Sequence, residues 1–356
     1  VLNSDLIPAN NPHPHFLLRV VFKETNMPTN QDKTILCITH SEDSFPVDWV
    51  IKHIEEEGGR AVRLNSDAYP LNVQIGGKLD DESFGTQLST SDWTLNCNEI
   101  GAIWHRKNRT CDLRSALSGD ILSQATRESE SIKRALLNSM NDVFWLDHPD
   151  TQIEGENKWL QLKMAKKAGL DVPATLFTNI PKQVRAFYHQ CKGDIVAKMH
   201  TPLTVSMGKP PAFVYTSKVT EAHLADLDSL KFSPMIFQQQ VQKKTELRIA
   251  YVYGHCFAGE VSLSSKDDQA LLDWRKASPV TSNWIHTEIP DELVQKLRIF
   301  MTSMNLKFGA IDIILDTARK YQFLEVNPAG EWGMLEAELD LPISKQIAQT
   351  LIKYSQ

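Results

Sequence analysis

Residues 321–335, YQFLEVNPAGEWGML, begin as an apolar strand and then turn at Pro328 and Gly330. Glu325 and Asn327 interrupt the apolar residues two positions apart, so in a strand their side chains point to one face. A carboxylate and an amide oxygen on one face suit a hard cation such as Mg²⁺, which takes few protein ligands and several phosphate oxygens. The alternative interpretation is a polar strand end that hydrogen-bonds to the turn after it.

A second apolar strand, FGAIDIILD at residues 308–316, comes shortly before this stretch and carries Asp312. We expect the two strands to be neighbours, so that Asp312, Glu325 and Asn327 converge as three oxygen ligands. Basic residues that could hold phosphate groups occur elsewhere in the chain: Lys158, Lys198, Arg248 and Arg275.

Lys198 lies within DIVAKM, an apolar strand at residues 194–199. An unpaired ammonium group is costly to bury, so this lysine needs an anionic partner. A bound phosphate would serve, and so would a carboxylate of the protein itself. The sequence leaves both partners open.

The composition is that of a soluble globular protein. The chain has 356 residues, which suggests two or three packed units. Hydrophobic residues make up 42% and charged residues 23% of the sequence, both ordinary values. The formal net charge of -6 provides no general basic surface, and no apolar run reaches the roughly 18 residues needed to span a bilayer. We therefore expect neither nucleic acid nor membrane as a partner.

The cysteines give no sign of a disulfide framework. Their number is odd, and no CxxC spacing suggests a zinc site. A reducing cytoplasm is therefore the expected location. The positions are Cys37, Cys97, Cys111, Cys191 and Cys256.

Strands and helices alternate from Thr34 onward, which predicts an α/β (α+β) fold. We expect an N-terminal α/β domain at residues 34–148, a central domain at 149–235 and a C-terminal domain at 236–356. Residues 1–33 are expected to be an extension or disordered arm, because the first 26 are rich in Pro and Asn.

Apolar residues at helical spacing, together with glycine stop signals, predict the main helices. They fall within residues 45–57, 118–140, 156–168, 291–305 and 342–355.

Five elements occur in an informative order: Lys158 within NKWLQLKMAKKAGLDVPAT, Lys198 within IVAKM, then FQQQVQKKTELRI, GAIDIIL and FLEVNPAGEWG. This order resembles the ATP-grasp superfamily. More narrowly, SPMIFQQQVQKKTELRI, DWRKAS, FGAIDIIL, FLEVNPAGEWGMLE and LPISKQIAQTL resemble the ATP-grasp ligases that cyclise microviridin-type ribosomal peptides, the graspetides. The form NPAGEWGMLE is most similar to the branch that makes ω-amide (lactam) links.

The resemblance implies an ATP-grasp fold, with ATP and Mg²⁺ held between the central and C-terminal domains. Lys158 and Lys198 would then approach the phosphates. Asp312, Glu325 and Asn327 would bind Mg²⁺ between the β- and γ-phosphates.

Further roles follow from the same resemblance. The hinge between the domains would be residues 238–241, comprising Gln238, Gln239 and Val241 as adenine contacts. Glu246 would take the ribose or orient Arg248.

The implied reaction has two steps. A side-chain carboxylate of a ribosomal precursor peptide attacks the γ-phosphate and gives an acyl-phosphate and ADP. A lysine amine of the same peptide then displaces phosphate and closes a lactam; a Thr or Ser hydroxyl would give an ester instead. Arg248 and Arg275 would be the catalytic residues, because positive groups stabilise the charge that develops during phosphoryl transfer.

Relatives read a leader segment of the precursor, and residues 200–217 are where we expect that leader to dock. Phe213 and Tyr215 lie on one face of the strand-like piece AFVYTS and could anchor it. Alternatively, both rings simply pack on the domain core. Leader binding is expected to order residues 206–211.

Other functions remain open. The chain could be a different ATP-grasp ligase acting on small amino acids, or a non-catalytic ATP-binding module that only recruits a peptide. The resemblance also suggests a homodimer.

Overall fold

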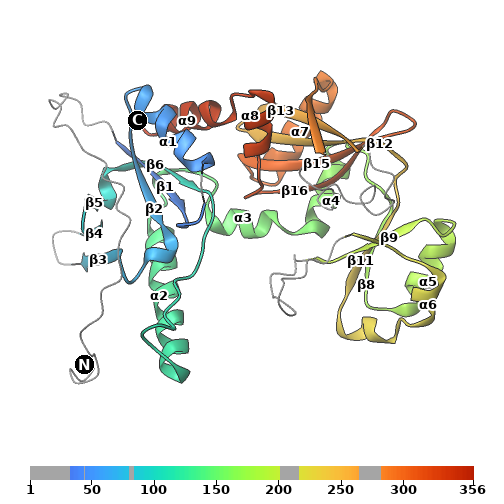
Figure 1. Cartoon of the computed structure of the whole chain (residues 1–356), viewed down its shortest axis with the longest axis horizontal. Helices are drawn as coiled ribbons and strands as arrows, with labels where there is room; N and C mark the ends of the chain where they lie inside the picture. The colour runs from blue at the N-terminus through green and yellow to red at the C-terminus, as the bar shows by residue number, and fades with distance from the viewer. Residues whose placement is uncertain (1–32, 44, 80–83, 201–215, 264–281) are drawn as a thin grey trace. The chain divides into compact units, whose positions relative to one another are not determined.

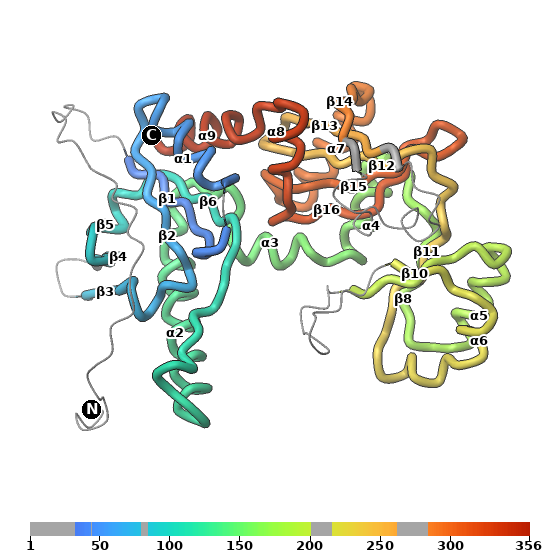
Figure 2. Tube along the Cα trace, in the orientation of Figure 1, coloured from blue at the N-terminus to red at the C-terminus, as the bar shows by residue number. Residues whose placement is uncertain are grey.

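The computed structural model describes residues 33–43, 45–79, 84–200, 216–263 and 282–356. Contacts group Asp32–Gln356 into one unit, apart from Val1–Gln31. The predicted arm thus lies almost wholly outside the described residues. The described strands form four sheets, drawn as ribbons in Figure 1 and as a tube in Figure 2.

The N-terminal sheet is wholly parallel, with the strand order β2-β1-β6-β7. Its strands are β1 (Thr34–Thr39), β2 (Arg60–Asn65), β6 (Ile100–His105) and β7 (Phe144–Leu146). Every residue of β1 is buried, as expected of a central parallel strand covered on both faces. Because parallel strands end at the same edge, the loop after β1 meets the residues that follow β6.

Two helices that are far apart in the sequence lie side by side against the N-terminal sheet. They are α1 (Pro46–Glu56) and α9 (Ile343–Tyr354), drawn in blue and red in Figure 1. The α1 helix ends as predicted, since Gly59 donates its N–H to the Ile54 carbonyl at 2.9 Å and Gly58 adopts φ +85°.

A small antiparallel meander and three helices complete the first half of the described chain. The meander has the order β3-β4-β5. The elements are β3 (Gln74–Leu79), β4 (Phe84–Ser89), β5 (Thr94–Asn96), α2 (Gly119–Ser139), α3 (Pro149–Gly155) and α4 (Lys158–Lys167).

A second four-stranded sheet has the order β10-β9-β11-β8, and its β9-β11-β8 pairs are antiparallel. Its strands are β8 (Thr175–Thr178), β9 (Ile195–Lys198), β10 (Ser217–Lys218) and β11 (Met235–Gln239). The helices α5 (Pro181–Gln190) and α6 (Glu221–Ala225) accompany it. The sequence analysis did not predict α5.

The C-terminal sheet is antiparallel, with the order β14-β13-β12-β15-β16. Its strands are β12 (Lys243–Val252), β13 (His255–Leu263), β14 (Ser282–His286), β15 (Phe308–Asp316) and β16 (Tyr321–Asn327). The remaining helices are α7 (Asp291–Ser303) and α8 (Gly333–Leu339). The predicted neighbourhood of β15 and β16 is confirmed.

Both faces of β12 are buried, in two different cores. Leu247, Ile249 and Tyr251 pack with α4 and α7. Ala250 and Val252 point the other way, into a core that also contains residues of α1, β1, β6, α8 and α9. One hydrophobic core therefore joins the N-terminal sheet to the C-terminal sheet.

A buried carboxylate also links the two sheets at this junction. Asp147, which is fully buried, accepts the backbone N–H groups of Lys307 and Phe308, each at 2.9 Å. Burial raises the pKa of Asp147 to about 6, although these two hydrogen bonds oppose the rise.

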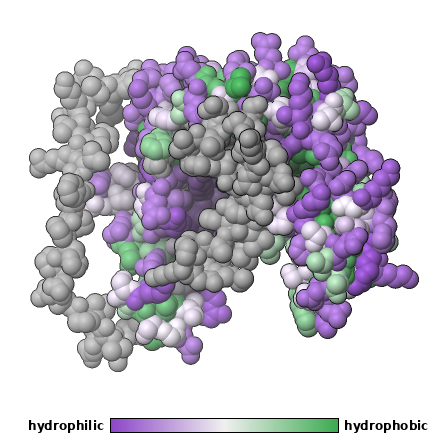
Figure 3. All heavy atoms as spheres, turned by 45° about the vertical axis from the view of Figure 1, so that its right-hand side comes forward, coloured by the Kyte–Doolittle hydropathy of each residue, from purple (hydrophilic) through white to green (hydrophobic). Residues whose placement is uncertain are grey.

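On the face drawn in Figure 3, hydrophilic residues predominate and hydrophobic ones form small separate groups. In the part of the chain that the structure describes, the longest helices are too polar or too short to cross a bilayer. All five cysteines are free thiols.

Candidate functional site

Three neighbouring strands of the C-terminal sheet carry a row of charged side chains. Arg248 of β12 lies opposite Asp312 of β15, which in turn lies opposite Glu325 of β16. Residues directly opposite each other in an antiparallel sheet share a face, so the three side chains are neighbours. Arg248 Nη1 donates to Asp312 Oδ1 at 2.7 Å.

A β-bulge at Leu324 gives this row its geometry. Asp312 pairs with Glu325, but Ile313 pairs with Phe323, so Leu324 is an extra residue in β16. The bulge breaks the alternation of the strand. Phe323 therefore points into the core, fully buried, while Glu325 and Asn327 share the other, partly exposed face.

The α4 helix completes the row from the edge of the sheet. Lys158, its first residue, forms an ion pair with Glu325, and the Asn157 side chain caps the helix by accepting the Leu160 N–H at 3.1 Å. A lysine at a helix N-terminus is electrostatically unfavourable, and the Glu325 carboxylate compensates for this. The order along the row is thus Arg248, Asp312, Glu325, Lys158, with two adjacent carboxylates flanked by a cation at each end.

Gln161, one turn further along α4, binds the backbone between the two predicted ligands of β16. Its side chain donates to the Val326 carbonyl at 2.9 Å and accepts the Val326 N–H at 3.0 Å. It also donates to the Gly155 carbonyl at 2.7 Å. Because β16 is an edge strand, these bonds replace those of a missing neighbouring strand.

Asn327 begins the turn after β16. Its side-chain oxygen accepts the Ala329 N–H at 3.1 Å, which is the turn hydrogen bond that the sequence left open as an alternative. A Cβ placed on Gly330 would lie 2.4 Å from the Ala310 Cβ and 3.1 Å from Arg248 Nη2. The turn therefore lies directly against the sheet and needs glycine there.

Lys198, at the end of β9, donates to Gln238 Oε1 at 2.8 Å, and the Gln238 amide donates to the Thr175 hydroxyl at 3.0 Å. The backbone of Gln238 and Gln239 pairs within the sheet. The predicted hinge at residues 238–241 therefore begins inside β11, and only its end, which includes Val241, follows the strand.

Glu246 forms an ion pair with Lys243. Arg275, Phe213 and Tyr215 lie outside the described residues, as does the predicted docking loop at 206–211.

The sequence analysis missed Arg106 and Lys107, which follow β6. Arg106 Nη2 is 2.6 Å from the Glu331 carboxylate, and Nη1 donates to the Gly330 carbonyl at 3.3 Å. Lys107 pairs with Glu331 and, at 3.2 Å, with Asp43. Two cations directly after an apolar strand, in IGAIWHRK, were the available signal.

These ion pairs shift the pKa values of two carboxyl groups. Burial by itself would raise the pKa of Asp43 and of Glu331, but Arg106 and Lys107 outweigh it, and the pKa of each carboxyl falls below its ordinary value. Both groups are therefore anionic at neutral pH.

The predicted metal ligands fit Mg²⁺. The described residues contain no group of three or more His, Cys, Asp or Glu side chains suited to a metal. The predicted set has two carboxylates and one amide, all hard oxygen donors on one face of β15 and β16. Mg²⁺ takes its other ligands from phosphates and water, so a small protein set is what it requires.

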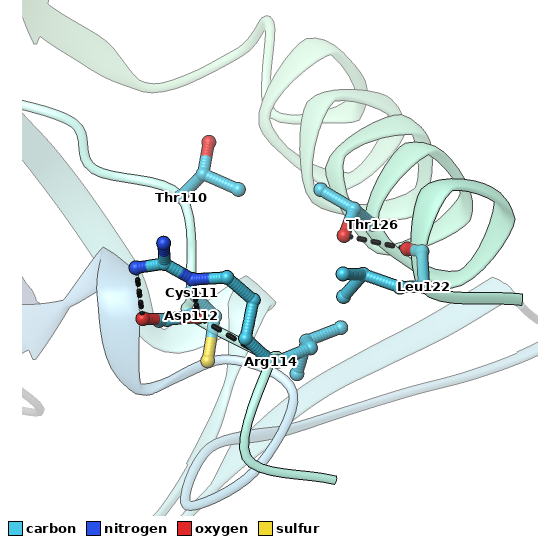
Figure 4. Close-up of a pocket in the computed structure, with 7 residues that line it drawn as sticks. Thr110, Cys111, Asp112, Arg114, Leu122 and Thr126 are labelled. Atoms are coloured by element: carbon cyan, nitrogen blue, oxygen red, sulfur yellow. Dashed lines mark hydrogen bonds and ion pairs between the residues drawn. The ribbon is translucent and has the colours of Figure 1, made fainter. Parts of the chain in front are cut away.

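A hollow of about 330 Å³ lies elsewhere, between α2 and residues 110–114 (Figure 4). Asp112 and Arg114 line it and pair with each other at 2.6 Å. The Thr126 hydroxyl donates to the Leu122 carbonyl at 2.8 Å. The paired Asp112 and Arg114 side chains neutralise each other, so the lining of this hollow has no net positive charge that would attract a phosphate.

Comparison with known proteins gives one family-model match and several similar structures. The model described as the MvdD pre-ATP grasp domain matches residues 34–152. Macrocyclase MdnB from Microcystis aeruginosa MRC is 36% identical with a TM-score of 0.76, covering 90% of this chain and 99% of MdnB. No curated protein sequence matches the chain.

Two further structures contain peptides. A RiPP-associated ATP-grasp ligase of Chryseobacterium gregarium, in complex with ADP and a leader and core peptide, is 31% identical with a TM-score of 0.85, covering 90% of this chain and 97% of its own. Macrocyclase MdnC from M. aeruginosa MRC, bound with precursor peptide MdnA, is 30% identical with a TM-score of 0.80. The match covers 90% of this chain and 99% of MdnC.

The fold is therefore that of an ATP-grasp ligase, an ATP-dependent class of enzyme. Given identities of 30–36% over 90% of its length, the chain belongs to the RiPP-associated ATP-grasp ligases, which act in the maturation of ribosomal peptides. The predicted resemblance and the predicted α/β ATP-grasp fold are confirmed.

Proposed function

We propose that the chain is a peptide macrocyclase that phosphorylates Asp or Glu side chains of a precursor peptide and closes ω-amide links to Lys. The observation that supports this most is the row Arg248, Asp312, Glu325 and Lys158 beside Asn327. It gathers two carboxylates and two cations on one face of the C-terminal sheet, and these are the groups that would bind Mg²⁺ and phosphates. The ADP and peptides of the C. gregarium relative are consistent with these substrates.

The chain's own residues divide the work of binding ATP and Mg²⁺. Lys198 would contact the α- and β-phosphates, leaving its bond to Gln238. Asp312, Glu325 and Asn327 would hold Mg²⁺, and Lys158 would then turn from Glu325 to a phosphate. When bound, Mg²⁺ neutralises charge on the β- and γ-phosphates.

Arg248 is held close to where the acyl-phosphate would form. Its side chain is 9% exposed, and it binds Asp312 and the Glu331 carbonyl at once. A guanidinium group fixed in this way stabilises developing negative charge with little reorganisation. Activation is required because a carboxylate is a poor electrophile for an amine, and one bound peptide supplies both reacting groups.

The decisive experiment compares substrates. A precursor peptide with leader and core should lose one water per ring, seen by mass spectrometry, with one ADP released per ring. Free amino acids should give no ADP release. ADP release with amino acids alone would indicate a small-molecule ligase, and none with any substrate would indicate a recruitment module.

The linkage is tested on the product. Amide rings survive mild base, whereas ester rings open, and replacing the acceptor Lys of the core peptide should prevent ring closure. Rings that open in base, and that depend on Thr or Ser, would make the enzyme an ω-ester ligase.

The metal assignment is tested with Asp312→Asn and Glu325→Gln. Each removes a ligand charge but keeps the side chain's shape, so turnover should fall at least about 100-fold while the fold persists. Near wild-type turnover at ordinary Mg²⁺ in either variant would show that the assignment is wrong.

Leader recognition by residues 200–217, including Phe213 and Tyr215, remains part of the proposal. A separate leader peptide should raise turnover of a leaderless core, and deleting residues 206–211 should remove that stimulation while sparing nucleotide binding. A deletion variant that still responds fully would place the docking site elsewhere. Light scattering would test the proposed homodimer.

A further inference from the structure

The geometry points to Arg106 as a positioning residue for the nucleotide site, acting through the turn that follows Asn327. The inference rests on the proposed function in one respect, because it takes Asn327 as a metal ligand. Arg106 itself is not among the residues proposed to touch nucleotide, metal or peptide.

Two guanidinium groups hold this turn from two different sheets. Arg106, after β6 of the N-terminal sheet, donates to the Gly330 carbonyl at 3.3 Å and to the Glu331 carboxylate at 2.6 Å. Arg248, in β12 of the C-terminal sheet, donates to the Glu331 carbonyl at 3.2 and 3.1 Å. Consecutive carbonyl groups are thus bound from both sheets. The backbone three residues after Asn327 has little freedom to shift.

The Arg106 side chain is itself fixed. It is 1% exposed, and its Nε lies 3.4 Å from the Asp43 carboxylate. The Arg106 backbone N–H donates to the Ile38 carbonyl of β1 at 2.9 Å. A buried guanidinium with carboxylates on two sides is a rigid fork, unlike a surface cation.

The turn is also anchored at its far end. Trp332 is fully buried in the core shared by the two sheets, and its ring lies 6.0 Å from the Arg106 guanidinium. The segment 327–332 therefore runs from a predicted metal ligand to a core anchor, with Arg106 bound between them. Loss of Arg106 frees the middle of that segment.

Replacing a residue that orients a metal ligand indirectly usually lowers metal affinity or activity about 10–100-fold. A purely structural role at the junction is the competing explanation. The two differ in what they predict for Mg²⁺, because a structural role lowers stability without changing the metal requirement of the folded enzyme.

The test uses Arg106→Gln and Arg106→Lys, with Arg63→Gln as the matched control. Arg63 also donates to backbone carbonyls, those of Asp43 at 2.6 Å and His40 at 3.2 Å, but none of its hydrogen bonds reaches residues 327–332. The measurements are the thermal midpoint, the Mg²⁺ dependence of AMPPNP binding without peptide, and hydrogen exchange across residues 327–332.

Arg106→Gln should raise the Mg²⁺ concentration for half-maximal AMPPNP binding about 10-fold and speed exchange in the turn. Arg63→Gln should lower the thermal midpoint but keep the wild-type Mg²⁺ dependence. Arg106→Lys should recover much of the midpoint, since it keeps the charge beside Asp43. It should still need more Mg²⁺, because one ammonium cannot bind both Gly330 and Glu331 as a fork does.

Wild-type Mg²⁺ dependence in both Arg106 variants, with a changed dependence in Asp312→Asn, would overturn the inference and leave the proposed site intact. Wild-type dependence in Asp312→Asn would refute the metal assignment, and the inference with it. If Arg106→Gln does not fold, Arg106→Lys and Glu331→Gln decide by the same criterion.

Discussion

Replacing Gln161 by leucine should damage the site without touching any proposed ligand. Gln161 is 1% exposed and binds both backbone groups of Val326, the residue between Glu325 and Asn327. Leucine fills a similar volume but offers no hydrogen bond. Stability and turnover should therefore both fall.

The size of the effect follows from the three hydrogen bonds that are lost. The Val326 N–H becomes a buried donor without its acceptor, which costs about 1–3 kcal/mol. The carbonyl groups of Val326 and Gly155 each lose a donor, at 2.9 and 2.7 Å, and add a smaller amount. Leucine recovers some apolar burial, so we expect a net loss of about 2–4 kcal/mol in the free energy of unfolding.

The effect on turnover comes from movement of β16. A misplacement of about 1 Å at a reacting centre can cost roughly 100-fold in rate, so kcat/KM for the peptide should fall about 10–100-fold. Denaturant unfolding and ADP release measure the two quantities, and hydrogen exchange at Val326 reports the freed strand edge.

Gln152→Leu is the matched control. Gln152 is also buried and makes two hydrogen bonds, to the His105 carbonyl at 2.7 Å and to the His105 ring at 2.6 Å, and neither of them reaches β16 or the Arg106 side chain. It should lose similar stability but keep wild-type kcat/KM. Equal turnover in the two folded variants would refute the argument that Gln161 positions the ligands.

Three further predictions can be checked directly. Lys198→Ala should weaken AMPPNP binding about 10–100-fold in a calorimetric titration, because it removes a charge-assisted phosphate contact; unchanged affinity would leave this lysine a structural role. Gly330→Ala should lower the free energy of unfolding by about 1–3 kcal/mol and impair ADP release, since its Cβ would lie 2.4 Å from another Cβ. Gly76→Ala, with nothing within 4 Å, is the control that should change neither. Asp147, with its pKa raised from 3.8 to about 6, favours the folded state most when protonated. Relative to Asp147→Asn, wild-type stability should therefore fall by about 3 kcal/mol in all as the pH rises from about 3 to about 7, and a flat difference in urea unfolding would contradict this.

The sequence alone determined the elements with a strong local pattern. The helix at α1 follows from its apolar stripe and its two terminal glycines, and both are local features. The strands β15 and β16 follow from apolar runs, and Asp312, Glu325 and Asn327 stand out because each is polar where its neighbours are not. The order of these elements along the chain was enough to indicate the family.

Only the tertiary structure decided how the candidate site is held. The bulge at Leu324 places Phe323 and Glu325 on different faces, although regular alternation would put them on one. That register depends on pairing with β15, and no property of the β16 sequence alone fixes it.

The partners that fix the turn and the strand were also beyond local reasoning. Gln161 binds a strand 165 residues away, and Arg106 pairs with a carboxylate 225 residues away. In the sequence, Gln161 reads as an ordinary helix residue and Arg106 as a charge after a strand. Their roles come from two separate cores: one packs α4 against β16, and the other holds β6 together with Trp332 at the end of the turn. Such long-range packing leaves no periodic signal in the chain.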